Sequence, residues 1–445
     1  MKHITLFCVL TAVLGIGCSR IEDRRGMDSF PVDPVTGAVR DADVLPLSDG
    51  TLLAFFTPDV DVAEPGGFIL LCRSTNKPRS WSGPDTVVQT TLPCFSPFAL
   101  QLRDGLLLVV FSLSNPDPVR SVGKTGGVFM VTSYDYGETF GVPRMVKSEG
   151  SGRIRLTGRP VELPDGRIVL PVMTGSGDES AAAVIFSEDR GLTWGVSVPV
   201  APAGQYVNPK LIQIPGSGIL CILESAAAGD PVFRTLSPDM GRTWSIPRST
   251  NLFGKRPEVL RTPDGSLMCA LVKEWPRGLA ISYSYDNGMT WAGEWTAVEG
   301  DFDDSPLALF AAGKARYGLV FKDKNSRDGY PVLRGIRFYS EPLDPPGGIS
   351  VSVTKGAARF RWNQMPEAAY YLVFRNDSAA FDPVLLFPPA GNLLATPGDA
   401  KFTDTGLDSG QVAWYRIAAV KSRGPLLKGT GNMGAVSEVI QVRGK

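Results

Sequence analysis

Histidine is almost absent from this sequence of 445 residues: the single one, His3, lies in an N-terminal segment that we expect to be removed. A mature chain without imidazole cannot run a Ser-His-Asp or Cys-His mechanism, and it cannot build a zinc site that contains histidine. No Cys-x-x-Cys pair is present either. General acid–base chemistry therefore has to come from carboxyl groups, tyrosine or lysine, and we expect neither a metal nor a cofactor.

The chain also lacks an excess of either charge and, beyond its N-terminus, any long apolar run. Its 45 basic and 45 acidic residues give a formal net charge of zero, so it has no electrostatic footprint for nucleic acid. No later stretch is apolar for long enough to form a transmembrane helix. We therefore exclude nucleic acid as a partner, and membrane contact would need a lipid anchor.

Residues 1–18 have the pattern of a bacterial secretion signal. Lys2 supplies the positive charge, residues 4–16 form a short apolar core, and Cys18 follows the small residue Gly17. This end resembles a lipobox, in which the cysteine is lipidated and becomes the mature N-terminus. We expect an exported protein that is lipid-anchored through Cys18 to the outer membrane of the cell envelope, with plain secretion as the alternative.

Of the six cysteines, Cys8 and Cys18 belong to the leader, which leaves four. Cys221 and Cys269 occupy equivalent positions in two apolar segments, so we expect both to be buried free thiols. The sequence leaves open whether Cys72 and Cys94 form a disulfide bond.

An octapeptide of the form Ser-x-Asp-x-Gly-x-Thr-aromatic recurs along the middle of the chain. Its copies cover 133–140, 187–194, 237–244 and 284–291, and a degenerate copy covers 74–81. The carboxylate can accept N–H groups of its own turn while the glycine supplies a positive φ, so we assign a structural role to Asp135, Asp189, Asp239 and Asp286. A period of about fifty residues is typical of four-stranded propeller blades.

A second repeat sets the number of blades. Turns of the Asp-Gly type, each leading into an apolar strand, occur near residues 49, 104, 165, 216, 264 and 312. Six turns predict six blades. The residues shortly before each turn start the innermost strands, so we expect their charged and amide side chains to form a ring at the mouth of the central channel.

The composition changes after residue 340. Residues 341–348 are rich in proline and glycine and predict a linker, and residues 349–445 show the alternation of short strands. This last part resembles a fibronectin type III module, with Trp362 as core tryptophan and Leu407 and Tyr415 as a tyrosine-corner pair. The predicted fold is all-β: a six-bladed β-propeller over 28–340 followed by a small β-sandwich, which we expect to be a spacer or docking module.

The octapeptide resembles the Asp-box, or bacterial neuraminidase repeat, of the sialidase superfamily, and the resemblance covers the whole propeller. Sialidases bind the substrate carboxylate with three arginines and cleave with a tyrosine nucleophile, an assisting glutamate and an acid/base aspartate. The resemblance implies that Arg40 and Arg256 stand where two of the arginines would lie. It offers Asp59, Asp61 and Glu64 as alternatives for the acid/base residue, and Asp61 is our candidate.

Other positions depart from the sialidase pattern. By strand register, the assisting glutamate aligns with Asn208, the second arginine with Glu224, the tyrosine with Asp304 and the final supporting glutamate with Lys322. No tyrosine lies between Tyr285 and Tyr317 to replace the nucleophile. We therefore expect altered catalytic residues, namely Asp61, Asp304 and Glu224, and substrate contacts from Arg40, Arg159, Asn208 and Arg256.

These observations predict a monomeric, exported glycoside hydrolase of the exo-α-sialidase type that acts on glycans at the channel mouth. One alternative is a catalytically inactive glycan-binding propeller, and another is a surface scaffold whose C-terminal module docks a partner. For the ring itself, the alternative is structural: Arg159 and Arg256 would pair with Glu224, Glu258 or Asp304 inside the protein.

Overall fold

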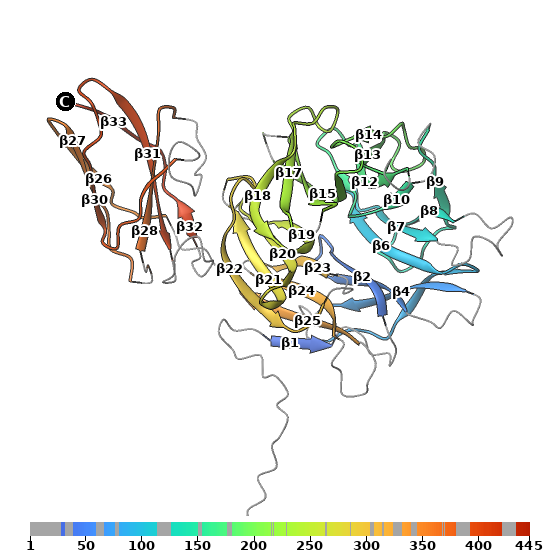
Figure 1. The fold of residues 1–445 in the computed structure, drawn as a ribbon. Coiled ribbons are helices and arrows are strands. Elements are labelled where there is room, and N and C mark those ends of the chain that lie inside the picture. The colour runs from blue at the N-terminus through green and yellow to red at the C-terminus, as the bar shows by residue number, and fades with distance from the viewer. Residues whose placement is uncertain are drawn as a thin grey trace, which may run out of the picture.

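The computed structural model of the chain is all-β, as predicted (Figure 1). It describes residues 28–31, 39–58, 66–75, 80–113, 126–149, 154–175, 180–214, 216, 218–227, 229–262, 265–284, 286–302, 307–313, 316–323, 332–339, 345–366, 368, 370–379, 392–420 and 433–445. Among these residues there is no helix long and apolar enough to cross a membrane.

The described residues between 28 and 339 form six antiparallel sheets, the blades of a propeller (Figure 1). Blade 1 contains β2 (Val39–Pro46), β3 (Leu52–Pro58), β4 (Gly67–Ser74) and β5 (Asp85–Thr90). Blade 2 contains β6 (Cys94–Gln101), β7 (Leu107–Leu113), β8 (Gly127–Ser133) and β9 (Arg144–Val146). Blade 3 contains β10 (Ile154–Leu156), β11 (Val161–Glu162), β12 (Ile168–Thr174), β13 (Ala181–Ser187) and β14 (Val198–Pro199).

Blade 4 contains β15 (Tyr206–Ile214), β16 (Gly218–Ser225), β17 (Pro231–Ser237) and β18 (Arg248–Phe253). Blade 5 contains β19 (Lys255–Arg261), β20 (Leu267–Glu274), β21 (Arg277–Ser284) and β22 (Ala292–Glu299). Blade 6 contains β23 (Leu307–Gly313), β24 (Arg316–Asp323), β25 (Val332–Tyr339) and β1 (Asp28–Pro31). Its outermost strand, β1, thus comes from the other end of the propeller sequence, with Asp28 opposite Arg337.

The core of the propeller lies between the blades. Six clusters of buried apolar side chains each join two neighbouring blades, including blade 6 and blade 1. At the junction of blades 6 and 1, for example, Phe56 packs in one cluster with Phe310 and Val320. Because every blade contributes to two clusters, the hydrophobic effect holds the sheets in a closed ring.

The four complete octapeptides form the turns between the third and fourth strands of blades 2 to 5. In blade 2, Asp135 Oδ1 accepts the backbone N–H of Thr139 at 2.9 Å and Ser133 Oγ lies 2.7 Å from the same oxygen. Gly137 has a φ of 87°, as the glycine of this turn was predicted to have. The residue before it, Tyr136, also has a positive φ of 57°, which the sequence did not reveal.

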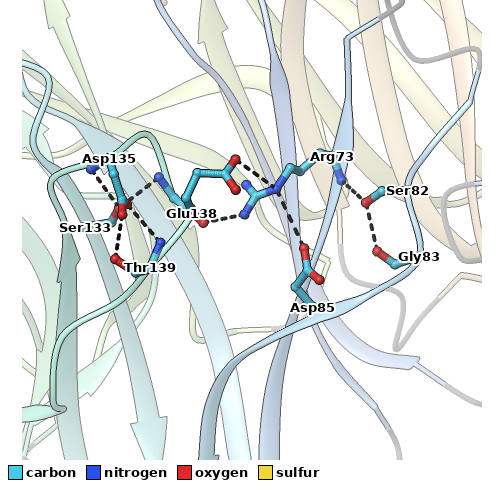
Figure 2. A network of polar contacts seen from close by, with 9 residues as sticks. Arg73, Ser82, Gly83, Asp85, Ser133, Asp135, Glu138 and Thr139 are labelled. Carbon is cyan, nitrogen blue, oxygen red and sulfur yellow. Dashed lines mark hydrogen bonds and ion pairs between the residues drawn. The ribbon is translucent and has the colours of Figure 1, made fainter.

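These turns also contact the preceding blade. Figure 2 shows Arg73 of blade 1 between Asp85 and Glu138, with its Nη2 donating to the carbonyl oxygen of Gly137. Arg234 of blade 4 likewise donates to the carbonyl oxygen of Asn287 in blade 5, at 2.7 Å. The Asp-boxes therefore fix each turn and join adjacent blades.

The C-terminal part is a two-sheet sandwich beside the propeller (Figure 1). One sheet contains β26 (Ser350–Thr354), β27 (Ala357–Arg361) and β30 (Lys401–Asp404). The other contains β28 (Tyr370–Asn376), β29 (Leu393–Ala395), β31 (Val412–Val420), β32 (Met433–Val436) and β33 (Ile440–Arg443). Trp362, Leu407 and Tyr415 share the core between the sheets. Tyr415 donates its hydroxyl to Asp404 Oδ2 at 2.5 Å, and the fibronectin type III identity of this sandwich stays a prediction.

The four cysteines beyond the leader are buried thiols that form no disulfide bond. Cys221 and Cys269 lie at equivalent positions of β16 and β20, as predicted. Burial raises the pKa of both thiols, which makes them unreactive packing residues. For Cys72 and Cys94, the structure resolves the alternative left open by the sequence in favour of thiols.

Candidate active site

The starts of the innermost strands surround a cavity of about 260 Å³ at one end of the channel. Its described lining consists of Asp41, Ala42, Ser96, Pro97, Phe98, Arg155, Leu156, Thr157, Asn208, Lys210, Glu224, Arg256, Glu258 and Leu307. The cavity lies at the opposite end of the blades from the Asp-boxes, since β19 begins here and β21 runs from this end to the box at Ser284. Residues from all six blades thus meet at one place.

Three of the lining residues have an unusual backbone. Ser96, Asn208 and Arg256 have φ values of 49°, 52° and 53°, and each precedes a proline at the start of the innermost strand of its blade. The strand pairing is interrupted at each of them, between Phe95 and Phe98 in β6 for example. Positive φ at residues other than glycine is strained, and bulges beside active sites redirect side chains and N–H groups. The repeated distortion at strand starts around one cavity makes this cavity the candidate functional site.

The first of these distorted residues, Ser96, donates a hydrogen bond to a carboxylate. Ser96 of blade 2 donates its backbone N–H to Asp41 Oδ2 of blade 1, at 3.0 Å. Burial raises the pKa of Asp41, although this hydrogen bond and the positive charges of Arg256, Arg40 and Lys322 oppose the shift. Asp41 is therefore a carboxyl group that holds its proton more tightly than an ordinary aspartate.

A second carboxyl group has a parallel environment. Glu224, near the end of β16, accepts a hydrogen bond from Asn208 Nδ2 at 3.1 Å and another from the backbone of Arg256. Burial raises its pKa as well, against the opposing effects of Asn208, Lys210 and Arg256. Arg256 thus acts electrostatically on both carboxyl groups.

Glu224 also borders a second depression on the same face of the propeller. This one has a volume of about 410 Å³ and lies between blades 4 and 5, where Phe253, Lys255, Lys273 and Trp275 contribute to its lining. Glu224 is the residue that the two cavities have in common. Its carboxyl group therefore stands at the boundary between them.

Lys210 and Glu258 form one wall of the channel cavity. Their side chains make an ion pair and are 13% and 14% exposed. The Lys210 ammonium group also lies 5.2 Å from the centre of the Phe98 ring. Because each charge has a partner, this pair shapes the wall without adding net charge.

Arg159 occupies a different place from the other ring arginines. Its Nε donates to Asp43 Oδ1 at 2.6 Å, and its two terminal nitrogens donate to the carbonyl oxygens of Leu309 and Val44, each at 3.1 Å. Asp43, which is 2% exposed, also accepts the N–H of Ala99. This network joins blades 1, 2, 3 and 6, so the guanidinium group has a structural role, although its carboxylate partner is Asp43 and not one of the residues named in the structural alternative, Glu224, Glu258 and Asp304.

The other predicted site residues fall into three groups: those that line the channel cavity, those beside it, and those outside the described residues. Asn208, Glu224 and Arg256 line the channel cavity. Arg40 lies beside it, with its guanidinium carbon 4.6 Å from the centre of the Phe95 ring, and Lys322 is close enough to influence Asp41. Asp61, with Asp59 and Glu64, and Asp304 lie outside the described residues, so their roles stay predictions.

Sequence reasoning did not select Asp41, Arg155, Lys210 and Glu258 as site residues, although all four line the cavity. Asp41 lies at a predicted strand start, but the sialidase resemblance implied a role for its neighbour Arg40 instead. The signal that could have found the site is a polar residue before proline at several strand starts. Of the described residues that line the cavity, none is a tyrosine. Tyr317 is buried between blades 5 and 6, and Tyr206 packs against Phe233.

Comparison with known proteins agrees with this architecture. The sequence matches the family described as BNR repeat-like domain over residues 50–333. No curated protein matches the sequence significantly. A crystal structure of a protein of unknown function from Dyadobacter fermentans superimposes with a TM-score of 0.62 and 18% identity, covering 71% of this chain and 100% of the other.

Two structures of named enzymes are also similar. The NanB sialidase of Streptococcus pneumoniae has a TM-score of 0.55 and 13% identity, with 70% of each chain covered. The α-L-arabinanase of Penicillium chrysogenum, crystallised with arabinobiose, has a TM-score of 0.52 and 13% identity, with 70% of this chain and 97% of the other covered. At such identities the likeness shows the fold, a sialidase-like β-propeller. With the family match spanning more than half of its length, the chain belongs to the BNR repeat-like domain family.

Proposed function

We propose that this protein is a glycoside hydrolase that cleaves glycans at the channel mouth with two carboxyl groups, Asp41 and Glu224. The observation that carries the proposal is that both groups face one cavity and that burial raises the pKa of each. A carboxyl group with a raised pKa can protonate a leaving-group oxygen, and a second one, in its ionised form, can act as base or nucleophile.

Glu224 is the better proton donor of the two by position. A general acid must reach the oxygen that joins two sugars, and Glu224 lies at the boundary of two adjoining cavities. Asp41, which borders only the channel cavity, would face the sugar ring bound there. If Asp61 and Asp304 also reach the mouth, as the sialidase resemblance implies, they would add to this set of carboxyl groups.

The charges around the channel cavity favour a polyhydroxy sugar over a strongly anionic one. Arg155, Lys210 and Arg256 are balanced by Asp41, Glu224 and Glu258 along the described lining. A sialidase clamp instead concentrates three arginines on one carboxylate. The balanced charges and the absence of tyrosine from the described lining support slow or no cleavage of ordinary sialosides.

The test is hydrolysis of a panel of aryl glycosides and linear oligosaccharides by the wild-type protein and by the Asp41→Asn and Glu224→Gln variants. We expect release of sugar from some members of the panel, with turnover reduced about a hundredfold or more in either variant, because each loses a proton-transfer group. Asp49→Asn is the matched control, since Asp49 lies in an exposed turn at the far end of blade 1 and accepts the N–H of Thr51 through Oδ1. Normal turnover by both variants would contradict the assignment, and binding without release by the wild type would favour the inactive glycan-binding propeller.

A further inference from the structure

An exposed tryptophan stands on the channel face of blade 5. Trp275 follows the end of β20 and is 87% exposed, more than any other large apolar side chain of the described residues. Lys255, at the start of β19, pairs with Val272 near the end of β20, so the channel end of blade 5 is also the end that carries Trp275. Trp275 is thus on the same face as the proposed active site.

The indole is part of a formed cavity and not an isolated side chain. It lines the depression of about 410 Å³ between blades 4 and 5 together with Phe253, which is 53% exposed. The rim carries the Lys255–Glu274 ion pair at 2.6 Å, and Lys273, paired with Glu294 at 3.1 Å, contributes to the lining. Two exposed aromatic rings with polar groups at the edge are typical of a binding site, because aromatic faces bury large apolar areas while polar groups fix orientation.

We infer that this depression is a sugar-binding subsite, in which Trp275 holds the part of a glycan that leaves after cleavage at Glu224. The inference rests on the proposed function and extends it to an oligosaccharide substrate. Sugar rings have one apolar face and a rim of hydroxyls, which suits a flat indole flanked by charged side chains. Because Glu224 borders both cavities, a chain with one sugar in the channel and the next against Trp275 would bring the joining oxygen to the carboxyl group.

A peptide or a second protein would fit this depression less well. Its described lining combines cationic and anionic side chains with small apolar residues, and Trp275 and Phe253 are its aromatic groups. The adjacency of the two cavities at Glu224 favours an extended polar chain that occupies both. A glycan of two or more sugars meets these requirements.

The test compares glycans of different length. The probes are immobilised mono- to hexasaccharides, including 3′-sialyllactose and linear arabino-oligosaccharides, bound by the full chain and its variants. We expect Trp275→Ala to weaken binding of the longer glycans about tenfold, the value of one aromatic contact, and to leave binding of monosaccharides within about twofold of the wild type. Trp275→Phe, which keeps an aromatic face, should restore most of the loss.

The matched control is Tyr134→Ala. Tyr134 is an aromatic residue of similar exposure, 79%, but it belongs to the Asp-box turn at the other end of blade 2. If Trp275→Ala bound long glycans as well as the wild type while Arg256→Ala bound them more weakly, the subsite would be refuted and the proposed function would stand. Absence of binding of every probe by the wild-type protein would overturn the proposed function and the subsite together.

Discussion

Asn208 donates a side-chain N–H to Glu224, with Nδ2 and Oε1 3.1 Å apart. The two residues lie on neighbouring strands, and the register between β15 and β16 is interrupted between Val207 and Lys210. The bulge and the positive φ of Asn208 turn its amide toward the carboxyl group. This contact gives a way to change the pKa of Glu224 without removing it.

Replacing Asn208 should shift the pH dependence of turnover. The Asn208 hydrogen bond lowers the pKa of Glu224, against the dominant effect of burial, so Asn208→Ala should raise that pKa further. A general acid works below its pKa, and the alkaline limb of the kcat/KM profile should therefore move to higher pH. Glu224→Gln should remove this limb, and an unmoved limb in Asn208→Ala would exclude Glu224 as the proton donor.

Arg159 and Arg256 should respond differently to the same substitution. Arg159→Ala leaves the buried Asp43 carboxylate without its cation, so we expect a loss of about 3–5 kcal/mol in the free energy of unfolding. Arg256 is exposed, so Arg256→Ala should lower the free energy of unfolding by less than about 1 kcal/mol. The same substitution should weaken glycan binding. Urea unfolding and the glycan panel measure the two effects, and equal destabilisation by both would contradict this division.

Gly241 should tolerate no side chain. Its φ is 91°, and a Cβ there would lie 2.6 Å from Cζ of Phe186 in the preceding blade. Gly166→Ala is the matched control, because Gly166 has a φ of 86° but no atom within 4 Å of the added Cβ. We expect about 1 kcal/mol of destabilisation from backbone strain in the control and clearly more in Gly241→Ala, seen as a larger drop in melting temperature. Equal shifts would show that the contact with Phe186 is unimportant.

The Asp-boxes of blades 2 and 4 should make the stability of the fold depend on acid pH. Hydrogen bonds from Thr139 and Ser133 lower the pKa of Asp135 to about 2, and equivalent bonds from Thr243 and Ser237 lower that of Asp239 to about 2. A lowered carboxyl pKa stabilises the fold above the unfolded value of about 3.8 and loses this effect as the pH falls toward 2. The free energy of unfolding should thus decline between about pH 4 and pH 2, and less steeply in the Asp135→Asn, Asp239→Asn double variant. An equally steep decline in the double variant would show that other carboxyl groups cause it.

We propose that Cys18 is lipidated and attaches the protein to the cell envelope. Nine residues, 19–27, separate Cys18 from β1, so an extended tether would keep the propeller within about 35 Å of the membrane surface. Cell fractionation and mass spectrometry of Cys18→Ala test this, with the wild type as control. Unchanged membrane partitioning of the variant would refute the anchor.

The architecture followed from the sequence because its determinants are local. Asp135 and Gly137 act within one turn, and such turns recur at the period of a blade. The number of blades could be counted from the separate Asp-Gly turns, which are also local features. The conformation of Tyr136 could not be predicted from the sequence, since a positive φ at a residue other than glycine depends on the tightness of the whole turn.

The site was harder to predict because it is assembled from distant segments. Asp41 and Ser96 are 55 positions apart, and their hydrogen bond exists only when blades 1 and 2 pack together. The raised pKa of Asp41 results from burial in that assembled ring, which composition and spacing do not show. Trp275 carried no motif, and only its exposure beside Glu224 gives it significance.

The pairing of β1 with β25 has a consequence for how the molecule is made. Asp28 and Arg337 are opposite one another although 309 positions separate them, so blade 6 lacks its outer strand until nearly the whole propeller has been synthesised. Blades 1 to 5 draw all their strands from consecutive sequence and can form in order as the chain emerges. The segment 28–31 can pair only after β25 has been synthesised, so we expect closure of the ring through this pairing to be a slow, long-range step of folding.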